Sequence, residues 1–335
     1  MEILSRVHAK NLVNWSANKP EVLVLSADLT SSTEIDLFRE AYPSRFISAG
    51  IAEQNMLSVA AGLAREGFVP FIHTFAVFIY RRAFDQMAMS IAYSNLPVKM
   101  FGFLPGITTP GGATHQATDD IAVVRALPNM TIFEAGDATE IESLLDPVME
   151  TNGPVYIRML RGDVPRLFDK NEPLKKGINR VLSRGTDFTV ISSGLCTEEA
   201  IKAVKALKAK GLSITHFHVS TLKPFNSKDI LDSIASSKYG AITMENHTVL
   251  GGLGSIVADA MAGAGIGKKL YKLGLQDKFG HGASKGYLMR EYGFDAMALV
   301  LKAEEIAGAK FGITENELKS VKIEVMHGDI KAEDL

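Results

Sequence analysis

Short apolar runs alternate along the first half of the chain with segments that repeat apolar residues at helical spacing. The apolar runs predict strands at residues 22–26, 45–49, 68–75, 98–104, 131–133 and 155–159. The helical patterns between them lie at residues 53–65, 77–90 and 119–127. This alternation is typical of a largely parallel sheet with helices on both faces, so the fold class is α/β.

The pattern stops in a polar, proline-containing stretch and then starts again. Residues 162–186 show no convincing periodicity. Beyond them, strands are predicted at 188–192, 213–219 and 241–245, and helices at 197–210, 227–236 and 253–262. We therefore expect a first domain at residues 1–165, a linker at 166–186 and a second, smaller α/β domain at 187–335. The last thirty residues are polar, and we expect them to be helical or frayed.

Composition excludes several classes of function. The 335 residues are 46% apolar and 22% charged with a net charge of −2, which offers no general attraction for nucleic acid or for an anionic membrane. No apolar stretch has the length of a transmembrane helix, and the first residues do not resemble a signal peptide. A single cysteine, Cys196, excludes an internal disulfide and a cysteine metal cluster. We expect a cytoplasmic protein that carries no metal ligands of its own.

The most informative segment is Gly50-Ile51-Ala52-Glu53-Gln54-Asn55-Met56, at the junction of a predicted strand and helix. Gly50 permits a tight turn, and Glu53 falls in the first turn of the helix. An acid at that position is often no more than a favourable partner of the helix dipole. The neighbouring residues point to a more specific role.

Gly-Ile-Ala-Glu-Gln-Asn resembles the pyrimidine-binding domain of thiamine-diphosphate enzymes, in particular the transketolase family. In that family the glutamate hydrogen-bonds N1′ of the cofactor's aminopyrimidine and so promotes loss of the proton from C2 of the thiazolium. Glu53 is similar in setting to that acid. The resemblance covers about residues 5–305 and implies two domains, the pyrimidine-binding domain and the transketolase C-terminal domain.

The segment Thr74-Phe75-Ala76-Val77-Phe78 resembles the wall of the family's pyrimidine pocket. By this resemblance Phe78 is the ring that stacks on the cofactor and Phe75 is its neighbour, although core packing would also account for two aromatics. Arg81 stands where full-length transketolases have an aromatic residue. An arginine before Ala-Phe-Asp-Gln is more like 1-deoxyxylulose-5-phosphate synthases and split transketolases, and Arg81 is a candidate cofactor contact.

Three further segments match the family. Ser26-Ala27-Asp28-Leu29-Thr30 implies that Asp28 lines the cofactor cleft, and Ser32 matches a phosphate-binding serine, although both residue types are also common helix caps. Gly111-Gly112-Ala113-Thr114-His115-Gln116 resembles Gly-(Pro/Ala)-Thr-His-Gln, whose histidine can polarise the donor carbonyl. Arg161 corresponds to an arginine that binds substrate phosphate, and it could equally tie down the linker.

Two departures concern the substrate. Transketolases usually carry an acid before Gly-(Pro/Ala)-Thr-His-Gln that reads a substrate hydroxyl, and here Gly111 holds its place. A histidine that normally lies about twelve residues before His115 is replaced by an apolar residue near Phe103. Recognition of the sugar hydroxyls and phosphate is therefore open, whereas cofactor activation is not affected.

The second half carries Glu245-Asn246-His247 and a glycine run before the predicted helix at 253–262. In the transketolase family these are mainly structural and support the subunit interface. The sequence lacks the Gly-Asp-Gly and later Asn with which the family binds Mg²⁺ and the diphosphate. The resemblance therefore implies the C-terminal subunit of a split transketolase. A separate N-terminal subunit would supply the metal site, in an α2β2 heterotetramer that acts on sugars or sugar phosphates.

Three alternatives stay open. One is the beta subunit of a 2-oxoacid dehydrogenase decarboxylase, which also contains Gly-Ile-Ala-Glu. The second is a synthase related to 1-deoxyxylulose-5-phosphate synthase, which joins pyruvate to an aldehyde. The third is a non-catalytic regulatory subunit, and the joint presence of Glu53, Phe78 and His115 argues against it.

Overall fold

A seven-stranded sheet forms the centre of the first structural unit in the computed structural model, which describes residues 2–326. Its strand order is β12-β6-β7-β5-β4-β2-β3, and every neighbouring pair is parallel except β12 with β6. The strands of the chain's first half are β2 (Val22–Ser26), β3 (Phe46–Ser48), β4 (Val69–Phe75), β5 (Lys99–Phe103), β6 (Thr131–Glu134) and β7 (Val155–Met159).

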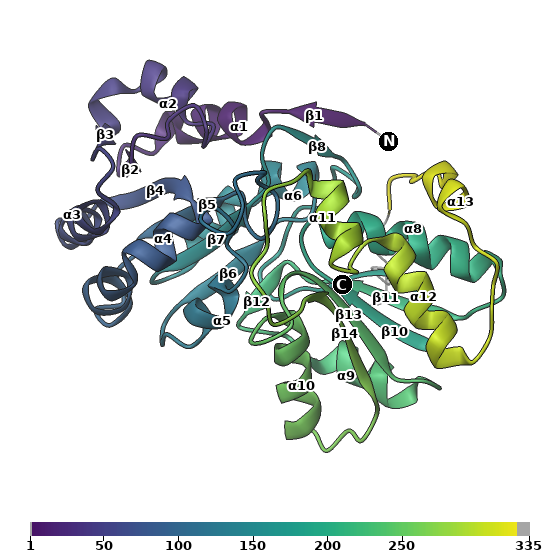
Figure 1. Ribbon diagram of the computed structural model, residues 1–335. Coiled ribbons are helices and arrows are strands. Elements are labelled where there is room, and N and C mark those ends of the chain that lie inside the picture. Colours follow the sequence, from purple (N-terminus) through teal and green to yellow (C-terminus); the bar gives the residue numbers. More distant parts are fainter. Residues whose placement is uncertain (1, 327–335) are drawn as a thin grey trace.

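Helices cover both faces of this sheet, as the alternating pattern predicted. They are α1 (Val7–Trp15), η1 (Ser16–Asn18), α2 (Asp36–Ala41), η2 (Pro43–Arg45), α3 (Glu53–Arg65), α4 (Ala76–Arg82), η3 (Gln86–Ala92), α5 (Asp120–Arg125), α6 (Ala138–Ser143) and α7 (Leu145–Glu150). Leu57 of α3 and Met87 of η3 belong to one buried cluster, whereas Leu12 of α1 and Val148 of α7 belong to another. Figure 1 shows this unit, coloured purple to teal, beside the second one.

The second unit is built on a five-stranded sheet of order β14-β13-β10-β11-β9. Only the edge strand β9 is antiparallel to its neighbour. The strands are β9 (Arg180–Ser183), β10 (Phe188–Ser192), β11 (Ile214–His218), β13 (Ala241–Thr248) and β14 (Leu270–Leu275). The helices are α8 (Cys196–Ala209), α9 (Lys228–Ser236), α10 (Leu253–Gly263), α11 (Lys285–Glu291), α12 (Ala296–Ala307) and α13 (Glu315–Ser320).

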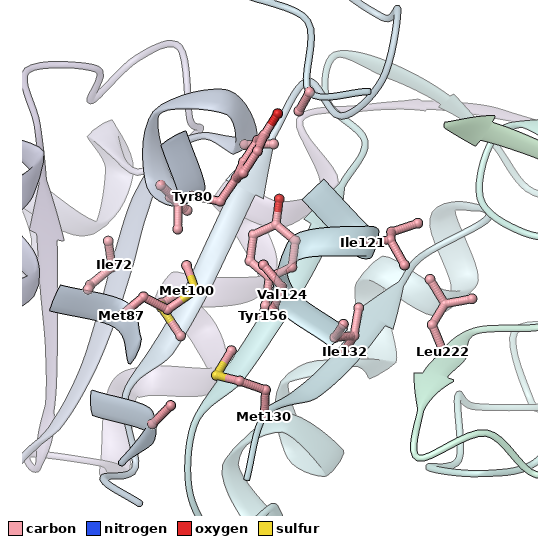
Figure 2. Packing of buried hydrophobic residues seen from close by; sticks show 14 of the residues in the cluster. Ile72, Tyr80, Met87, Met100, Ile121, Val124, Met130, Ile132, Tyr156 and Leu222 are labelled. Atoms are coloured by element: carbon pink, nitrogen blue, oxygen red, sulfur yellow. The ribbon is translucent and has the colours of Figure 1, made fainter. Parts of the chain in front are cut away.

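One strand from the second half of the chain forms the edge of the first sheet. Strand β12 (Thr221–Lys223) belongs to the second half of the sequence but pairs with β6 of the first sheet. Figure 2 shows Leu222 of β12 packed near Ile132 of β6 and Ile121 of α5, within one continuous buried cluster. This crossing strand places the end of β13 against the first unit.

The α/β fold class is confirmed, and the differences from the sequence pattern are local. The single helix expected at residues 77–90 is divided into α4 and the π-helical η3, because the backbone of Ala83 leaves the helical conformation (φ −125°, ψ 31°). Residues 162–186 contain β8 (Asp163–Pro165), which pairs with β1 (Ile3–Ser5), and β9. Strands of three or four residues are too short to show a period.

The expectation for the last thirty residues is met in part by α13, which is helical, while residues 327–335 lie outside the described part of the chain. Within residues 2–326, no helix is long and apolar enough to cross a membrane.

Candidate active site

The candidate residues come together because the parallel strands of the first sheet all end at one edge. Ser26 at the end of β2 is in register with Ser48 of β3, and Phe75 at the end of β4 is in register with Phe103 of β5. Phe103 is in turn in register with Met159 of β7. Ligands of open α/β sheets bind at this carboxyl edge, and here the loops that follow these strands meet.

Glu53 begins α3 at this edge and is buried, with 5% of its surface exposed. Gly50 precedes it with φ +68°, as the predicted turn requires. The Glu53 carboxylate accepts a hydrogen bond from Nη1 of Arg82 at 2.6 Å. An acid whose only role was to complement the helix dipole would sit in water, so burial and a specific partner give Glu53 a more defined environment.

Arg82 was not among the residues singled out in the sequence. Its guanidinium lies 3.8 Å from the centre of the Phe78 ring while it donates to Glu53. Phe78 and Arg82 are four residues apart on α4, so they project from the same face of the helix. The four-residue spacing from Phe78 could have identified Arg82 in the sequence. The adjacent Arg81 made the choice between the two arginines ambiguous.

Phe75 and Phe78, the two aromatics expected to form a wall, lie side by side. The rings of Phe75 and Phe78 lie in a stacked arrangement with centroids 5.7 Å apart. His115 meets Phe78 edge-on, with centroids 5.4 Å apart. Glu53, Phe78 and His115, taken from separate segments of the chain, therefore form one cluster with Arg82.

Arg81 takes a different position from Arg82. It donates to the Ala113 carbonyl oxygen at 3.1 Å and to the Asp119 carboxylate at 2.6 Å, and the Tyr80 hydroxyl also donates to Asp119. Arg81 thus contacts the loop at residues 105–117, the glycine-rich loop, which carries His115. If Arg81 contacts the cofactor, as the sequence predicted, it does so from the side of the site where Ala113 and Asp119 lie.

The loop geometry bears on the missing acid. A Cβ atom added to Gly111 would lie 3.0 Å from Cβ and Cγ of His115. The His115 side chain therefore lies over the place where the side chain of the expected acid would begin. Its Nδ1 is 2.9 Å from the Thr114 hydroxyl.

Ser32 and Arg161, the candidate phosphate contacts, are brought together by the structure. Nη1 of Arg161 donates to the Ser32 carbonyl oxygen at 3.1 Å. The next residue, Gly162, donates its N–H to the buried Glu34 carboxylate at 2.7 Å. Burial raises the pKa of Glu34. Asp28 lies exposed just beyond β2 with φ +59°.

A cavity of about 220 Å³ opens beside Arg161, between the two units. Thr108 of the glycine-rich loop and Lys285 of α11 also line it. The candidate anion-binding arginine is therefore next to a space that both halves of the chain enclose.

Comparison with protein families agrees with this geometry. Residues 5–166 match the model of the transketolase pyrimidine-binding domain, and residues 177–299 match that of the transketolase C-terminal domain. The chain belongs to the transketolase family.

The relatives differ in how much of their own length this chain covers. The chain is 36% identical over 301 residues to a 6-deoxy-6-sulfo-D-fructose transketolase subunit of Clostridium sp., covering 89% of this chain and 92% of that one. It is 32% identical to the 1-deoxy-D-xylulose-5-phosphate synthase of Prochlorococcus marinus, covering 88% of this chain but 46% of the synthase. A solved structure of a split-gene transketolase, described as an inactive β4 tetramer, superposes with a TM-score of 0.83 at 36% identity, over 91% of this chain and 98% of that chain.

The chain is therefore a beta-type subunit like those of split transketolases. Thiamine-diphosphate dependence is a property of the family, and it guides the interpretation of the cluster around Glu53.

Proposed function

We propose that the chain is the C-terminal subunit of a two-subunit, thiamine-diphosphate-dependent transketolase. It would transfer a two-carbon ketol unit from a ketose or ketose phosphate to an aldose acceptor. One observation carries the proposal: a buried acid accepts a hydrogen bond from a planar, cationic group that stacks on an aromatic ring. The Arg82 guanidinium stands in for an aminopyrimidine, which also presents flat N–H donors and a stacking face.

The residues present fit the cofactor's pyrimidine half. Thiamine diphosphate, when bound, supplies a carbon nucleophile that can add to a ketose carbonyl. Glu53 would hold a proton at N1′, and Phe78 and Phe75 would form the wall on which the pyrimidine lies. Asp28, at the same sheet edge, would line the cleft.

The substrate would lie on the His115 side of this wall. The His115 imidazole would polarise the donor carbonyl and stabilise the oxygen as negative charge develops on it. Ser32 and Arg161 would bind an anionic end of the donor, and guanidinium is suited to phosphate or sulfonate. The sulfo-fructose substrate in the relative's name makes a sulfonate as natural a candidate as a phosphate.

The Mg²⁺ and diphosphate ligands would come from a separate N-terminal subunit, in an α2β2 assembly in the cytoplasm. Residues 1–165 would provide the pyrimidine-binding domain and 187–335 the C-terminal domain. The relatives that match nearly end to end support this division, since one is named a subunit and another a split-gene product. That split-gene product forms a tetramer of beta chains alone, and the tetramer is described as inactive.

Calorimetric titration of thiamine diphosphate and Mg²⁺ tests the proposal with this chain alone, the partner subunit alone, and both together. We expect tight, Mg²⁺-dependent binding only to the mixture. Stoichiometric, micromolar, Mg²⁺-dependent binding to this chain alone would overturn the split-site assignment.

A synthase of the 1-deoxyxylulose-5-phosphate type is the second candidate, favoured by the similarity to the Prochlorococcus enzyme and by the Arg81-Arg82-Ala83-Phe84-Asp85-Gln86 run. The two candidate functions differ in the donor substrate that the enzyme would accept. The transketolase assignment predicts release of CO₂ from hydroxypyruvate but not from pyruvate, and the synthase assignment predicts release from pyruvate.

A further inference from the structure

The glycine-rich loop that carries His115 is held by the second half of the chain. Its base is closed by a hydrogen bond from the Gly106 N–H to the Ala117 carbonyl oxygen at 2.8 Å. Between these residues the loop offers few side chains that could pack against the first sheet. Arg81 of α4 holds the Ala113 carbonyl oxygen and Phe78 contacts the His115 ring, and the second half of the chain supplies further contacts.

Asn246, near the end of β13, supplies the most specific tie. Its Nδ2 donates to the Pro105 carbonyl oxygen at 2.9 Å, and its Oδ1 accepts from the Ile107 N–H at 3.0 Å. The side chain is 1% exposed, so both bonds lie out of water, where an unmade bond is costly. One amide thus fixes the backbone on both sides of Gly106.

The fit around Gly106 is close. A Cβ atom added there would lie 2.1 Å from Oδ1 of Asn246, and Gly106 has φ +60°. The amide therefore occupies the space that any side chain at position 106 would need.

Other contacts brace the same arrangement. The Asn246 carbonyl oxygen accepts from Nη2 of the buried Arg158 at 2.9 Å, which anchors the end of β13 to the first sheet. The Thr248 N–H donates to the Thr118 carbonyl oxygen at 2.7 Å, just beyond the loop. Farther along, Nε2 of Gln116 donates to the His281 carbonyl oxygen at 3.1 Å.

We propose that Asn246 is a positioning residue for the reaction: the C-terminal domain sets the place of His115 through the Asn246 amide. This inference rests on the proposed function. It gives the C-terminal domain a part in catalysis, although none of the bonds that carry it touches substrate or cofactor. The effect of Asn246 should pass through His115 and leave the Glu53 side of the site unchanged.

The test uses the assembled two-subunit enzyme with thiamine diphosphate, Mg²⁺ and hydroxypyruvate, and measures CO₂ release. Asn246→Ala should lower turnover about 10- to 100-fold, the loss expected when a catalytic group is misplaced by about 1 Å. In a His115→Ala background, the same change should alter turnover by less than about twofold, because residues that act as a unit are not additive. H/D exchange at C2 of the bound cofactor should stay within about twofold of the unmodified enzyme.

Asn226→Ala is the matched control. The Asn226 Nδ2 also donates to a backbone carbonyl oxygen, that of Gly177 at 2.9 Å, but this contact is not with the loop. It should leave turnover unchanged. Amide hydrogen exchange provides a second readout: Asn246→Ala should accelerate exchange at residues 105–117, and Asn226→Ala should not.

Three results would overturn the inference: unchanged turnover in Asn246→Ala, an equal loss in the presence and absence of His115, or an equal loss of C2 exchange. If Asn246→Ala fails to assemble, Gly106→Ala attacks the same contact from the loop side and should give the same pattern. An unmodified enzyme that shows neither C2 exchange nor CO₂ release would refute the proposed function instead. The amide-exchange comparison would still decide whether Asn246 holds the loop.

Discussion

Removing the Arg82 side chain should strengthen cofactor binding. In the free chain Arg82 bonds to Glu53 and stacks on Phe78, which are the two groups assigned to the pyrimidine ring. The ring cannot occupy that place until the guanidinium leaves it. We therefore expect the apparent affinity of the assembled enzyme for the cofactor to equal the intrinsic affinity multiplied by the fraction of molecules in which the arginine has left the site.

The structure limits the size of this effect. The Arg82 side chain is 45% exposed, so its ion pair with Glu53 is partly screened and contributes at most about 1 kcal/mol. Its contact with the Phe78 ring adds about 0.5–1 kcal/mol. Breaking both costs about 0.5–2 kcal/mol, so Arg82→Ala should lower the Kd of thiamine diphosphate about 2- to 30-fold.

Calorimetry of thiamine diphosphate binding to the assembled enzyme at saturating Mg²⁺ measures this directly. Arg82→Lys keeps the charge but not the flat stacking surface, and it should fall between the unmodified enzyme and Arg82→Ala. Arg65→Ala is a suitable control, since Arg65 lies at the far end of α3 and donates to the Ser94 hydroxyl at 3.3 Å.

Competition between Arg82 and the cofactor is refuted if Arg82→Ala binds thiamine diphosphate with unchanged or lower affinity. Lower affinity would mean that Arg82 moves aside on binding and then contributes a contact of its own. Unchanged affinity would mean that the pyrimidine ring does not compete for the surface formed by Glu53 and Phe78.

Three further predictions concern single residues. Glu53→Gln should leave the complex assembled but slow H/D exchange at C2 of the bound cofactor by orders of magnitude, and unchanged exchange would return Glu53 to a helix-dipole role. Arg161→Ala should raise KM for D-fructose 6-phosphate much more than for D-fructose, through loss of a charge-assisted bond of about 1.5–3 kcal/mol; equal changes would make Arg161 only an anchor for the Ser32 loop. Burial raises the pKa of Glu245 from 4.5 to about 8, so between these values the folded chain keeps a proton that the unfolded chain has lost. The contribution of Glu245 to the free energy of unfolding should fall with rising pH by up to about 1.4 kcal/mol per pH unit. Urea unfolding of Glu245→Gln at several pH values should show a free energy of unfolding without that pH dependence.

Much of the first sheet could be predicted from the sequence because its strands are buried on both faces. Strand β2 and strand β7 are buried throughout and coincide with the predicted runs. The short edge strands gave no such signal. Strand β12 consists of three residues whose place is set by a partner on the other half of the chain, and no local pattern can indicate that pairing.

In the candidate site, too, some features could be predicted from a sequence pattern and others depend on tertiary packing. Glu53, Phe78 and His115 stand in segments that match a family pattern, and the structure places them together. The role of Arg82 could not be separated from that of Arg81 in the sequence, because adjacent arginines on a helix differ only in direction. Arg81 reaches Asp119 and Arg82 reaches Glu53, which depends on how α4 meets α3 and α5.

Buried polar residues connect the two halves of the subunit. Arg158 is fully buried, and it pairs with Asp120 and Glu134 of the first unit while donating to the Asn246 carbonyl of the second. Separating the halves would break the hydrogen bond between Nη2 of Arg158 and the Asn246 carbonyl oxygen, whereas the ion pairs of Arg158 lie within the first unit. The end of β13 therefore supplies an acceptor to Arg158 and also carries the Asn246 amide that bonds to the His115 loop. The backbone carbonyl of Asn246 thus bonds to Arg158 of the first sheet, and the side-chain amide of the same residue bonds to Pro105 and Ile107 of the loop that carries His115.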